Sequence, residues 1–282
     1  MRRALIVVAL LAMCACERSR PLAQQGSGGG SGSAVQRIVT LTPSATEVVA
    51  ALGAASELVG VDEYSEYPPE VKQLPKVGSF LQPNQEVILS LRPTLVIVDD
   101  IHGSVAGALN DRGLETIECD MHALPDVKAA LRRVGTRIGR STKAEEIVTK
   151  IDADLDAAAA ARPSKHPRVL AIIDREAGGL GNLVAAGTGS WVDELLAVVG
   201  GDNVLAASGV RYPKISLEEV LRAQPDVILD ISFAGRSELT AWDAVAVPAV
   251  KNKRVRLLKE PYILGPSPRV KPALDDIAQA IR

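Results

Sequence analysis

Aromatic side chains in this sequence gather in segments that follow predicted β-strands, where they can line a binding pocket. Aromatic residues make up only 3% of the 282 positions, so the core must be aliphatic and the place of each ring is informative. In open α/β sheets, ligands bind beyond the carboxyl ends of the strands. Rings placed there predict a pocket for a large, partly apolar ligand, although tyrosine also occupies ordinary half-exposed turns. The candidate pocket residues are Tyr64, Phe80, Tyr212, Phe233 and Tyr262, with Tyr67 in the same segment as Tyr64.

Histidine is the residue type most suited to binding a metal here, and the chain has His102, His122 and His166 at scattered positions. This scatter predicts no metal site, because a zinc or manganese receptor needs several ligands brought together. His102 follows the strand predicted over residues 95–99 and is expected to face the pocket. Its imidazole can bind a metal that a ligand carries, although a lone histidine on a loop is more often solvated.

The sequence contains no motif for covalent chemistry. It has no Gly-x-Ser-x-Gly elbow, no phosphate-binding Walker loop and no His-Glu-x-x-His pair. Cys119 ends a predicted strand and is expected to be a small buried residue rather than a nucleophile. We therefore predict no catalytic residues and no resident cofactor. An α/β enzyme that uses the same cleft is the less favoured alternative.

Residues 1–16 have the pattern of a secretion signal. Two arginines precede an apolar run over residues 4–15, which is shorter than the about 20 residues needed to span a bilayer. The run ends in a small residue followed by Cys16, which resembles the cleavage box of bacterial lipoproteins. We predict lipidation at Cys16, with Cys14 as the second choice and a plain secretory signal as the alternative.

Residues 17–35 are predicted to be a flexible tether, because they include the string QQGSGGGSGS, which cannot bury an apolar face. The signal and the tether together predict a periplasmic or cell-envelope protein. Its contact with the lipid bilayer is expected only through the N-terminal anchor.

The charge balance argues against nucleic acid as a partner. The chain has 32 Lys and Arg against 34 Asp and Glu, a net charge of −2, and no basic run interleaved with aromatic residues. With 47% hydrophobic residues it has ample material for a core.

The fold class is predicted to be α/β, with two similar Rossmann-like lobes. Residues 86–97 match residues 218–229 at a constant displacement of 132 positions, which pairs Glu86 with Glu218. Apolar runs of this kind are typical of strands covered on both faces, as in parallel sheets. The predicted strands are residues 37–41, 58–61, 95–99 and 116–119 in the first series, and residues 168–173, 226–231 and 254–258 in the second.

A single long helix is predicted between the lobes, over residues 141–162. Thr142 and Glu145 have the spacing of a capping box, and Pro163 ends the pattern. About 20 helical residues make a rod of roughly 30 Å, which we expect to be rigid and to hold the lobes apart. The predicted organisation is a first lobe over residues 36–140, a linking helix over 141–163 and a second lobe over 164–282.

Several strings together resemble the periplasmic cobalamin-binding proteins of ABC importers, a family with a helical backbone between two lobes. In the first lobe these are RIVTLTPSATEVVAALG, VGVDEYSEYPP and VGSFLQPNQEVILSLRPTLVI. In the second lobe they are VDELLAVVGGDNV, YPKISLEEVL and PAVKNKRV. The resemblance runs from about Gln36 to Arg282.

This resemblance implies a monomeric substrate-binding protein that captures a corrinoid such as cobalamin between its lobes. It implies that Tyr64, Phe80 and Tyr212 lie against the corrin. From its position after the strand, His102 is a candidate ligand for the cobalt of a corrinoid or the iron of haem, and Tyr262 is a candidate ligand for haem iron in the alternative below. It further implies that Glu86 and Glu218 dock onto an ABC permease, which works with its ATPase. A haem or ferric-siderophore receptor on the same scaffold is the close alternative.

Overall fold

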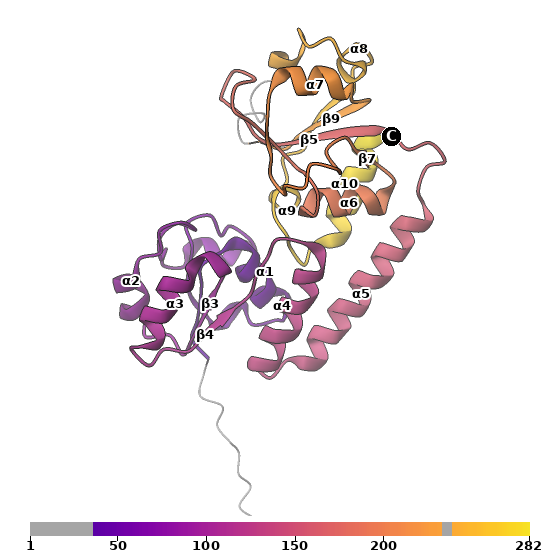
Figure 1. The fold of residues 1–282 in the computed structure, drawn as a ribbon. Coiled ribbons are helices and arrows are strands. Elements are labelled where there is room, and N and C mark those ends of the chain that lie inside the picture. The colour runs from indigo at the N-terminus through magenta and orange to yellow at the C-terminus, as the bar shows by residue number, and fades with distance from the viewer. Residues whose placement is uncertain (1–35, 233–238) are drawn as a thin grey trace, which may run out of the picture. The chain divides into compact units, whose positions relative to one another are not determined.

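The β-branched runs of the sequence pair into two sheets, one in each half of the chain (Figure 1). The computed structural model describes residues 36–232 and 239–282. The predicted lipidation site Cys16, its alternative Cys14 and the candidate pocket residue Phe233 lie outside these residues. All described residues belong to one unit, Val35–Arg282.

The first sheet is parallel throughout, with the order β2-β1-β3-β4. Side chains alternate between its faces: Ile38 packs in the same cluster as helices α1 (Pro43–Ala51) and α4 (Leu124–Arg137), and Val39 in the cluster of α2 (Gln85–Ser90) and α3 (Gly103–Asn110). Both faces are therefore covered, which explains the continuous apolar runs. The strands are β1 (Ile38–Thr40), β2 (Leu58–Val61), β3 (Leu95–Val98) and β4 (Thr116–Glu118).

The second sheet has a parallel part and an antiparallel part. Strands β5 (Arg168–Asp174), β9 (Val227–Asp230) and β10 (Val255–Leu257) are parallel, as the sequence predicts. The antiparallel strands β6 (Leu183–Ala185) and β8 (Lys214–Ile215) extend the sheet on the side of β5 away from β9. The short strand β7 (Asp202–Asn203) pairs with β5 in parallel. These added strands were not predicted, because runs of 3 and 2 residues show no alternation to detect.

Helix starts follow ordinary capping rules. Thr42 and Ser190 accept hydrogen bonds from the third residue beyond them and begin α1 and α6. The remaining helices are α5 (Ser141–Ala160), α6 (Trp191–Val199), α7 (Leu217–Ala223), α8 (Pro248–Lys251), α9 (Pro261–Leu264) and α10 (Val270–Ile281). In the described part of the chain, no helix combines the length and apolar character that a bilayer crossing requires.

The two halves repeat one architecture, which confirms the predicted pair of similar lobes. Asn84 caps α2 and Ser216 caps α7, at the displacement of 132 positions found in the sequence. Arg37 donates to the carbonyl oxygen of Leu91 at the end of α2 (2.7 Å). In the second lobe, Arg168 donates to the carbonyl oxygen of Ala223 at the end of α7 (2.8 Å). Equivalent arginines therefore anchor equivalent helices in the two lobes.

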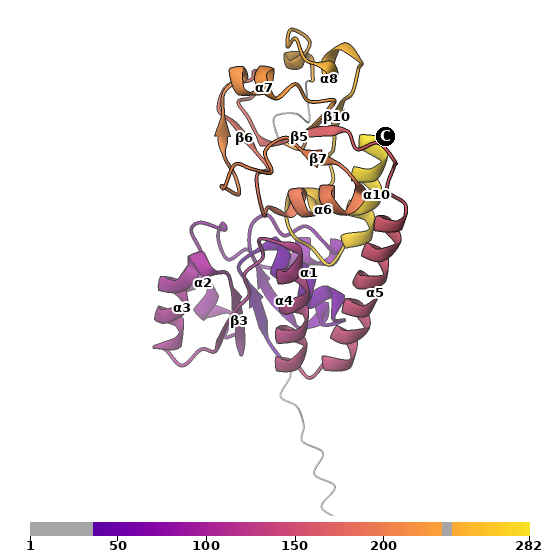
Figure 2. The same ribbon diagram turned by 45° about the vertical axis from the view of Figure 1, so that its right-hand side comes forward.

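Helix α5 is continuous and lies beside α4 (Figures 1 and 2). It is preceded by Arg140 without a side-chain cap, so the predicted capping box of Thr142 and Glu145 is wrong. Both residues lie inside the helix, and Glu145 pairs instead with Arg132 of α4 at 2.8 Å. The helix buries Ala144, Val148 and Ile151 against its neighbours.

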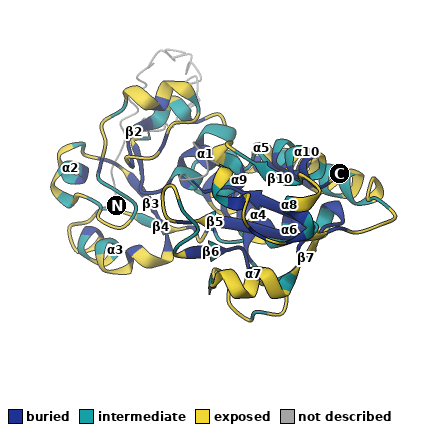
Figure 3. Cartoon of the chain, turned by 90° about the horizontal axis from the view of Figure 1, so that it is seen from above, coloured by how far each residue is buried: buried dark blue, intermediate teal, exposed yellow. Residues whose placement is uncertain are grey.

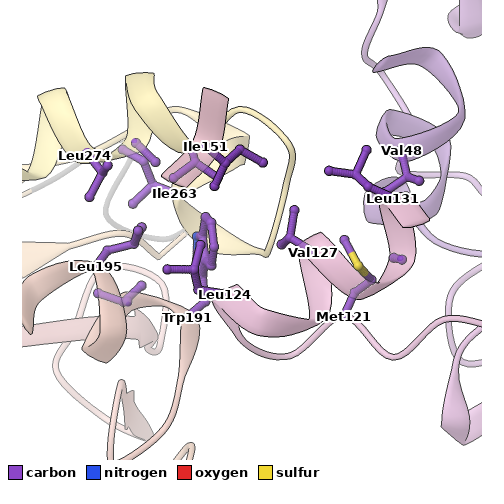
Figure 4. Close-up of a cluster of buried hydrophobic side chains, with 14 of the residues drawn as sticks. Val48, Met121, Leu124, Val127, Leu131, Ile151, Trp191, Leu195, Ile263 and Leu274 are labelled. Atoms are coloured by element: carbon purple, nitrogen blue, oxygen red, sulfur yellow. The ribbon is translucent and has the colours of Figure 1, made fainter. Parts of the chain in front are cut away.

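One hydrophobic cluster joins the two lobes (Figure 4). Trp191, the first residue of α6, lies against Leu124 and Val127 of α4. Ile151 of α5 and Leu274 of α10 belong to the same cluster. The lobes are thus continuous through packed side chains rather than through a single connecting segment.

Candidate ligand-binding site

A cavity of about 450 Å³ opens between the first lobe and the C-terminal segment of the second. A volume of this size is ordinary for a small-molecule site. Tyr64 and Tyr67 bring aromatic rings to it and are 62% and 45% exposed, so part of each ring is open to a ligand. The lining residues are Pro43, Glu47, Tyr64, Glu66, Tyr67, Pro69, Lys72, Pro261, Leu264 and Arg269.

A buried polar network holds the loop that carries Tyr64. The carboxylate of Asp62 accepts the backbone N–H of Tyr64 (2.9 Å) and the hydroxyl of Ser65. The Ser65 hydroxyl also bonds Thr46 of α1 at 2.7 Å, and Lys76 donates to the Ser65 carbonyl oxygen at 2.9 Å. Burial raises the pKa of Asp62, and its hydrogen bonds oppose that shift. The exposed ring therefore stands on a fixed backbone.

Arg269 closes one side of the cavity. Its guanidinium lies between two rings, 4.0 Å from the centroid of Tyr67 and 4.6 Å from that of Tyr262. It also forms a forked ion pair with Glu47 of α1, with Nε to Oε2 at 2.8 Å. Since Glu47 and Tyr67 belong to the first lobe and Tyr262 to the second, Arg269 ties the lobes together beside the pocket.

His102 has a role different from the predicted one. It is buried, its Nδ1 accepts the N–H of Asp99 (3.0 Å), and its Nε2 donates to the carbonyl oxygen of Phe80 (2.7 Å). Both ring nitrogens are therefore engaged with the backbone, which corrects the expectation of an imidazole open to a ligand metal. The Phe80 ring meets the imidazole edge-on, with centroids 5.4 Å apart. His102 positions the Phe80 segment.

Tyr262 also differs from the prediction. Its hydroxyl donates to Asp276 of α10 (2.7 Å), and its backbone oxygen accepts the indole N–H of Trp191 (3.2 Å). Burial and the Asp276 carboxylate raise the pKa of the phenol. Tyr262 thus supports Arg269 from behind and does not present its oxygen to the cavity.

Tyr212 lies on a loop that is pressed against the end of β6. Gly187 donates to the Arg211 carbonyl oxygen (2.8 Å), and a Cβ added at Gly187 would come within 2.1 Å of the Val210 carbonyl oxygen. Tyr212 is partly exposed and does not line the cavity of Tyr64. The structure brings Tyr64 into the described cavity, while Phe80 and Tyr212 stand on separate segments.

Glu86 and Glu218 are exposed on the first turns of α2 and α7. Glu219, not Glu218, closes the capping box with Ser216, because its carboxylate accepts the Ser216 N–H (2.7 Å). In the described part of the chain neither Glu86 nor Glu218 forms an ion pair. Figure 3 shows most of α7 exposed.

Sequence reasoning missed Glu47 and Arg269 as site residues. The two residues are 222 positions apart, and that separation hides the ion pair in the sequence. Cys119 is buried as expected, and burial raises the pKa of its thiol to about 12. At neutral pH it is a thiol packed in the core.

Comparison with known proteins agrees with this two-lobed architecture. A family model described as periplasmic binding protein matches residues 38–262, which is most of the chain. The chain belongs to the periplasmic binding protein family. Membership makes it a binding protein whose ligand is a transported molecule rather than a resident cofactor, and it indicates a periplasmic location.

Members of the family that resemble this protein are named for two ligands. The vitamin B12-binding protein of Vibrio cholerae serotype O1 is 27% identical over 88% of this chain and 89% of its own length. A solved vitamin B12-binding protein of Vibrio cholerae is 27% identical, with a TM-score of 0.71, 87% of this chain covered and 96% of its own. A periplasmic heme-binding protein from Roseiflexus sp. RS-1 is 30% identical, with a TM-score of 0.77, 88% of this chain covered and 98% of its own.

Proposed function

We propose that this periplasmic binding protein captures a corrinoid between its two lobes and delivers it to the permease of an ABC importer. The observation that carries the proposal is the Tyr64 ring, which is exposed in the cavity while Asp62 and Ser65 hold the backbone beneath it. A corrin presents a broad, partly apolar face with amide groups at its rim. A ring on a fixed backbone beside polar side chains suits such a face, because less backbone freedom is then lost when the ring stacks on the ligand.

A haem receptor is the second candidate, and one observation favours it. Lys72 and Arg269 line the cavity together with the phenols of Tyr64 and Tyr67. Cations can hold the carboxylates of a porphyrin, and a tyrosine oxygen can hold haem iron. His102 and Tyr262 are engaged elsewhere, so Tyr64 and Tyr67 are the phenols that the haem hypothesis needs.

The deciding experiment titrates cyanocobalamin, cobinamide, haemin and a ferric siderophore into the purified protein by calorimetry, with visible spectra recorded in parallel. Saturable one-to-one binding of a corrinoid supports the proposal. Tight binding of haemin without corrinoid binding contradicts it. Tyr64→Phe combined with Tyr67→Phe separates the two hypotheses further, because it removes both candidate iron ligands but keeps the stacking rings.

Glu86 and Glu218 are proposed to dock onto the permease. Each is exposed, lies outside any ion pair of the described residues, and occupies the same place in its lobe. Two carboxylates on repeated helices, in lobes joined by a common core, form a pair that complementary basic sites on a partner can recognise. An acid in the first turn of a helix stabilises that helix by about 0.3–1 kcal/mol through the macrodipole. This effect alone does not require the acid to be unpaired.

Lipid attachment at Cys16 is proposed from the sequence alone. Cys16→Ser is expected to abolish incorporation of labelled palmitate and to release the protein from membranes, whereas Cys14→Ser is expected to leave both unchanged. Retention of label in Cys16→Ser would move the attachment site to Cys14, and wild-type protein that takes up no label would refute lipidation.

A further inference from the structure

The first lobe contains a cluster of two carboxylates and an imidazole outside the cavity described above. Asp99 directly follows β3, Asp100 opens the short 3-10 turn that comes next, and His122 precedes α4. One donor atom from each residue lies within 4.8 Å of the other two. No metal site was predicted because the three histidines are scattered in the sequence; the sheet brings residues 99 and 122 together from the ends of different strands.

Asp99 is the unusual member of this cluster. It is 2% exposed, and its Oδ1 atom has no hydrogen-bond partner within the described structure. That atom faces Nε2 of His122 at 3.8 Å. A buried carboxylate oxygen without a partner is costly, so it requires a cation or a proton to satisfy it.

The spacing of the donors fits a small divalent cation. Nε2 of His122 lies 3.3 Å from Oδ1 of Asp100. Two ligands at metal bonds of about 2.0–2.1 Å with tetrahedral geometry stand about 3.3 Å apart. The longer 3.8 Å to Asp99 needs a side-chain adjustment of a few tenths of an ångström.

The backbone around the cluster is braced, and the cluster is accessible from solvent. His122 and Ala123 both donate their N–H to one oxygen of Asp126, at 3.1 and 2.9 Å. The side chain of Asp100 is 51% exposed and that of His122 25%, which provides an entry path and open coordination positions. Imidazole with carboxylates is a donor set suited to transition metals such as Zn²⁺ rather than to Ca²⁺ or Mg²⁺.

We propose that Asp99, Asp100 and His122 bind a divalent transition-metal cation that ties the end of β3 to the start of α4. The cation has a structural role. Asp99 donates its N–H to His102, which in turn holds the Phe80 carbonyl oxygen, so the tie also braces the Phe80 segment. The proposal does not depend on which ligand occupies the pocket.

The test uses the full protein without a histidine tag, stripped with a chelator and titrated with ZnCl₂ by calorimetry. We expect one tight site per chain and a rise in melting temperature with zinc. Asp99→Asn and His122→Gln should each weaken zinc binding at least tenfold and remove the zinc-dependent rise. His166→Ala is the matched control, since His166 faces a single carboxylate, Asp202, at 3.5 Å on the surface.

Two results would overturn the proposal. One is wild-type protein that binds no zinc, which would leave a shared proton as the occupant of the carboxylate pair. The other is wild-type zinc affinity in both Asp99→Asn and His122→Gln, with melting curves recorded without metal to confirm that both variants fold. Preference for CaCl₂ or MgCl₂ over ZnCl₂ would contradict the proposed class of cation.

Discussion

Glu47 and Glu194 occupy equivalent positions in the two lobes, and each crosses to the opposite lobe to bind the start of a helix. Glu47 of α1 bonds Ser267 and Arg269, which directly precede α10. Glu194 of α6 accepts the N–H of Leu124, the first residue of α4, at 2.5 Å. Glu194 is favourably placed because a carboxylate at a helix start meets an unpaired N–H group, whereas Glu47 is held by side chains just before α10. The contact between the lobes is therefore repeated, like the lobes themselves.

The Glu47–Arg269 pair is expected to contribute strongly to stability. Both side chains are largely buried, so Arg269→Ala leaves a carboxylate without its main partner and should lower the free energy of unfolding by about 3 kcal/mol. Arg269→Lys should lose less, because it keeps the charge but not the fork. Urea unfolding measures both.

Arg132→Ala is the control for that prediction. It breaks the exposed pair with Glu145 and should change the unfolding midpoint by no more than the measurement error. Equal effects of Arg269→Ala and Arg132→Ala on the free energy of unfolding would show that the interlobe pair contributes no more to stability than an exposed pair.

Glu194 predicts a pH dependence of stability. Burial raises the pKa of its carboxyl above its ordinary value near 4.5, so the folded protein binds this proton more tightly than the unfolded chain does. The contribution of Glu194 to stability is therefore present below about pH 4.5 and is lost as the pH rises through the raised pKa.

Glu194→Gln has no titrating carboxyl group, so it does not lose stability as the pH rises through the raised pKa. Its amide oxygen can still accept the Leu124 N–H. Its stability relative to wild type should increase from about pH 4.5 towards neutrality, as thermal melts across that range would record. A difference that stays constant with pH would show that the pKa of Glu194 is not shifted.

Tyr64 is expected to contribute to ligand affinity through stacking. Tyr64→Ala should weaken corrinoid binding about tenfold, since an aromatic pair is worth about 0.5–1.5 kcal/mol beyond the area that it buries. Tyr262→Phe is the matched control: it deletes the hydrogen bond to Asp276 but should leave affinity unchanged. Calorimetric titration measures the affinity of both variants. Wild-type affinity in Tyr64→Ala would exclude the Tyr64 ring from the site.

The proposed docking acids predict a separation of transport from binding. Glu86→Lys combined with Glu218→Lys should abolish uptake in cells and leave ligand affinity at the wild-type value, because both residues lie away from the cavity. Asp111→Lys combined with Asp243→Lys reverses two other exposed acids and should leave uptake intact. Loss of ligand affinity in the Glu86 and Glu218 variant would refute the docking role.

The sequence by itself determined the α/β class, the duplicated lobes and the long helix. These features depend on local periodicity and on a repeat, both of which can be detected along one chain. The first three positions of strand β3 and of its counterpart β9 are all apolar, because burial on both faces demands apolar residues there.

The tertiary structure alone decided the roles of individual polar side chains. His102 and Tyr262 were expected to face a ligand, yet their polar atoms are engaged by the Phe80 carbonyl oxygen and by Asp276. Glu47 and Arg269 are 222 positions apart and became partners only when the lobes packed. A polar atom bonds whichever group the fold brings within about 3 Å, and sequence spacing does not reveal that group.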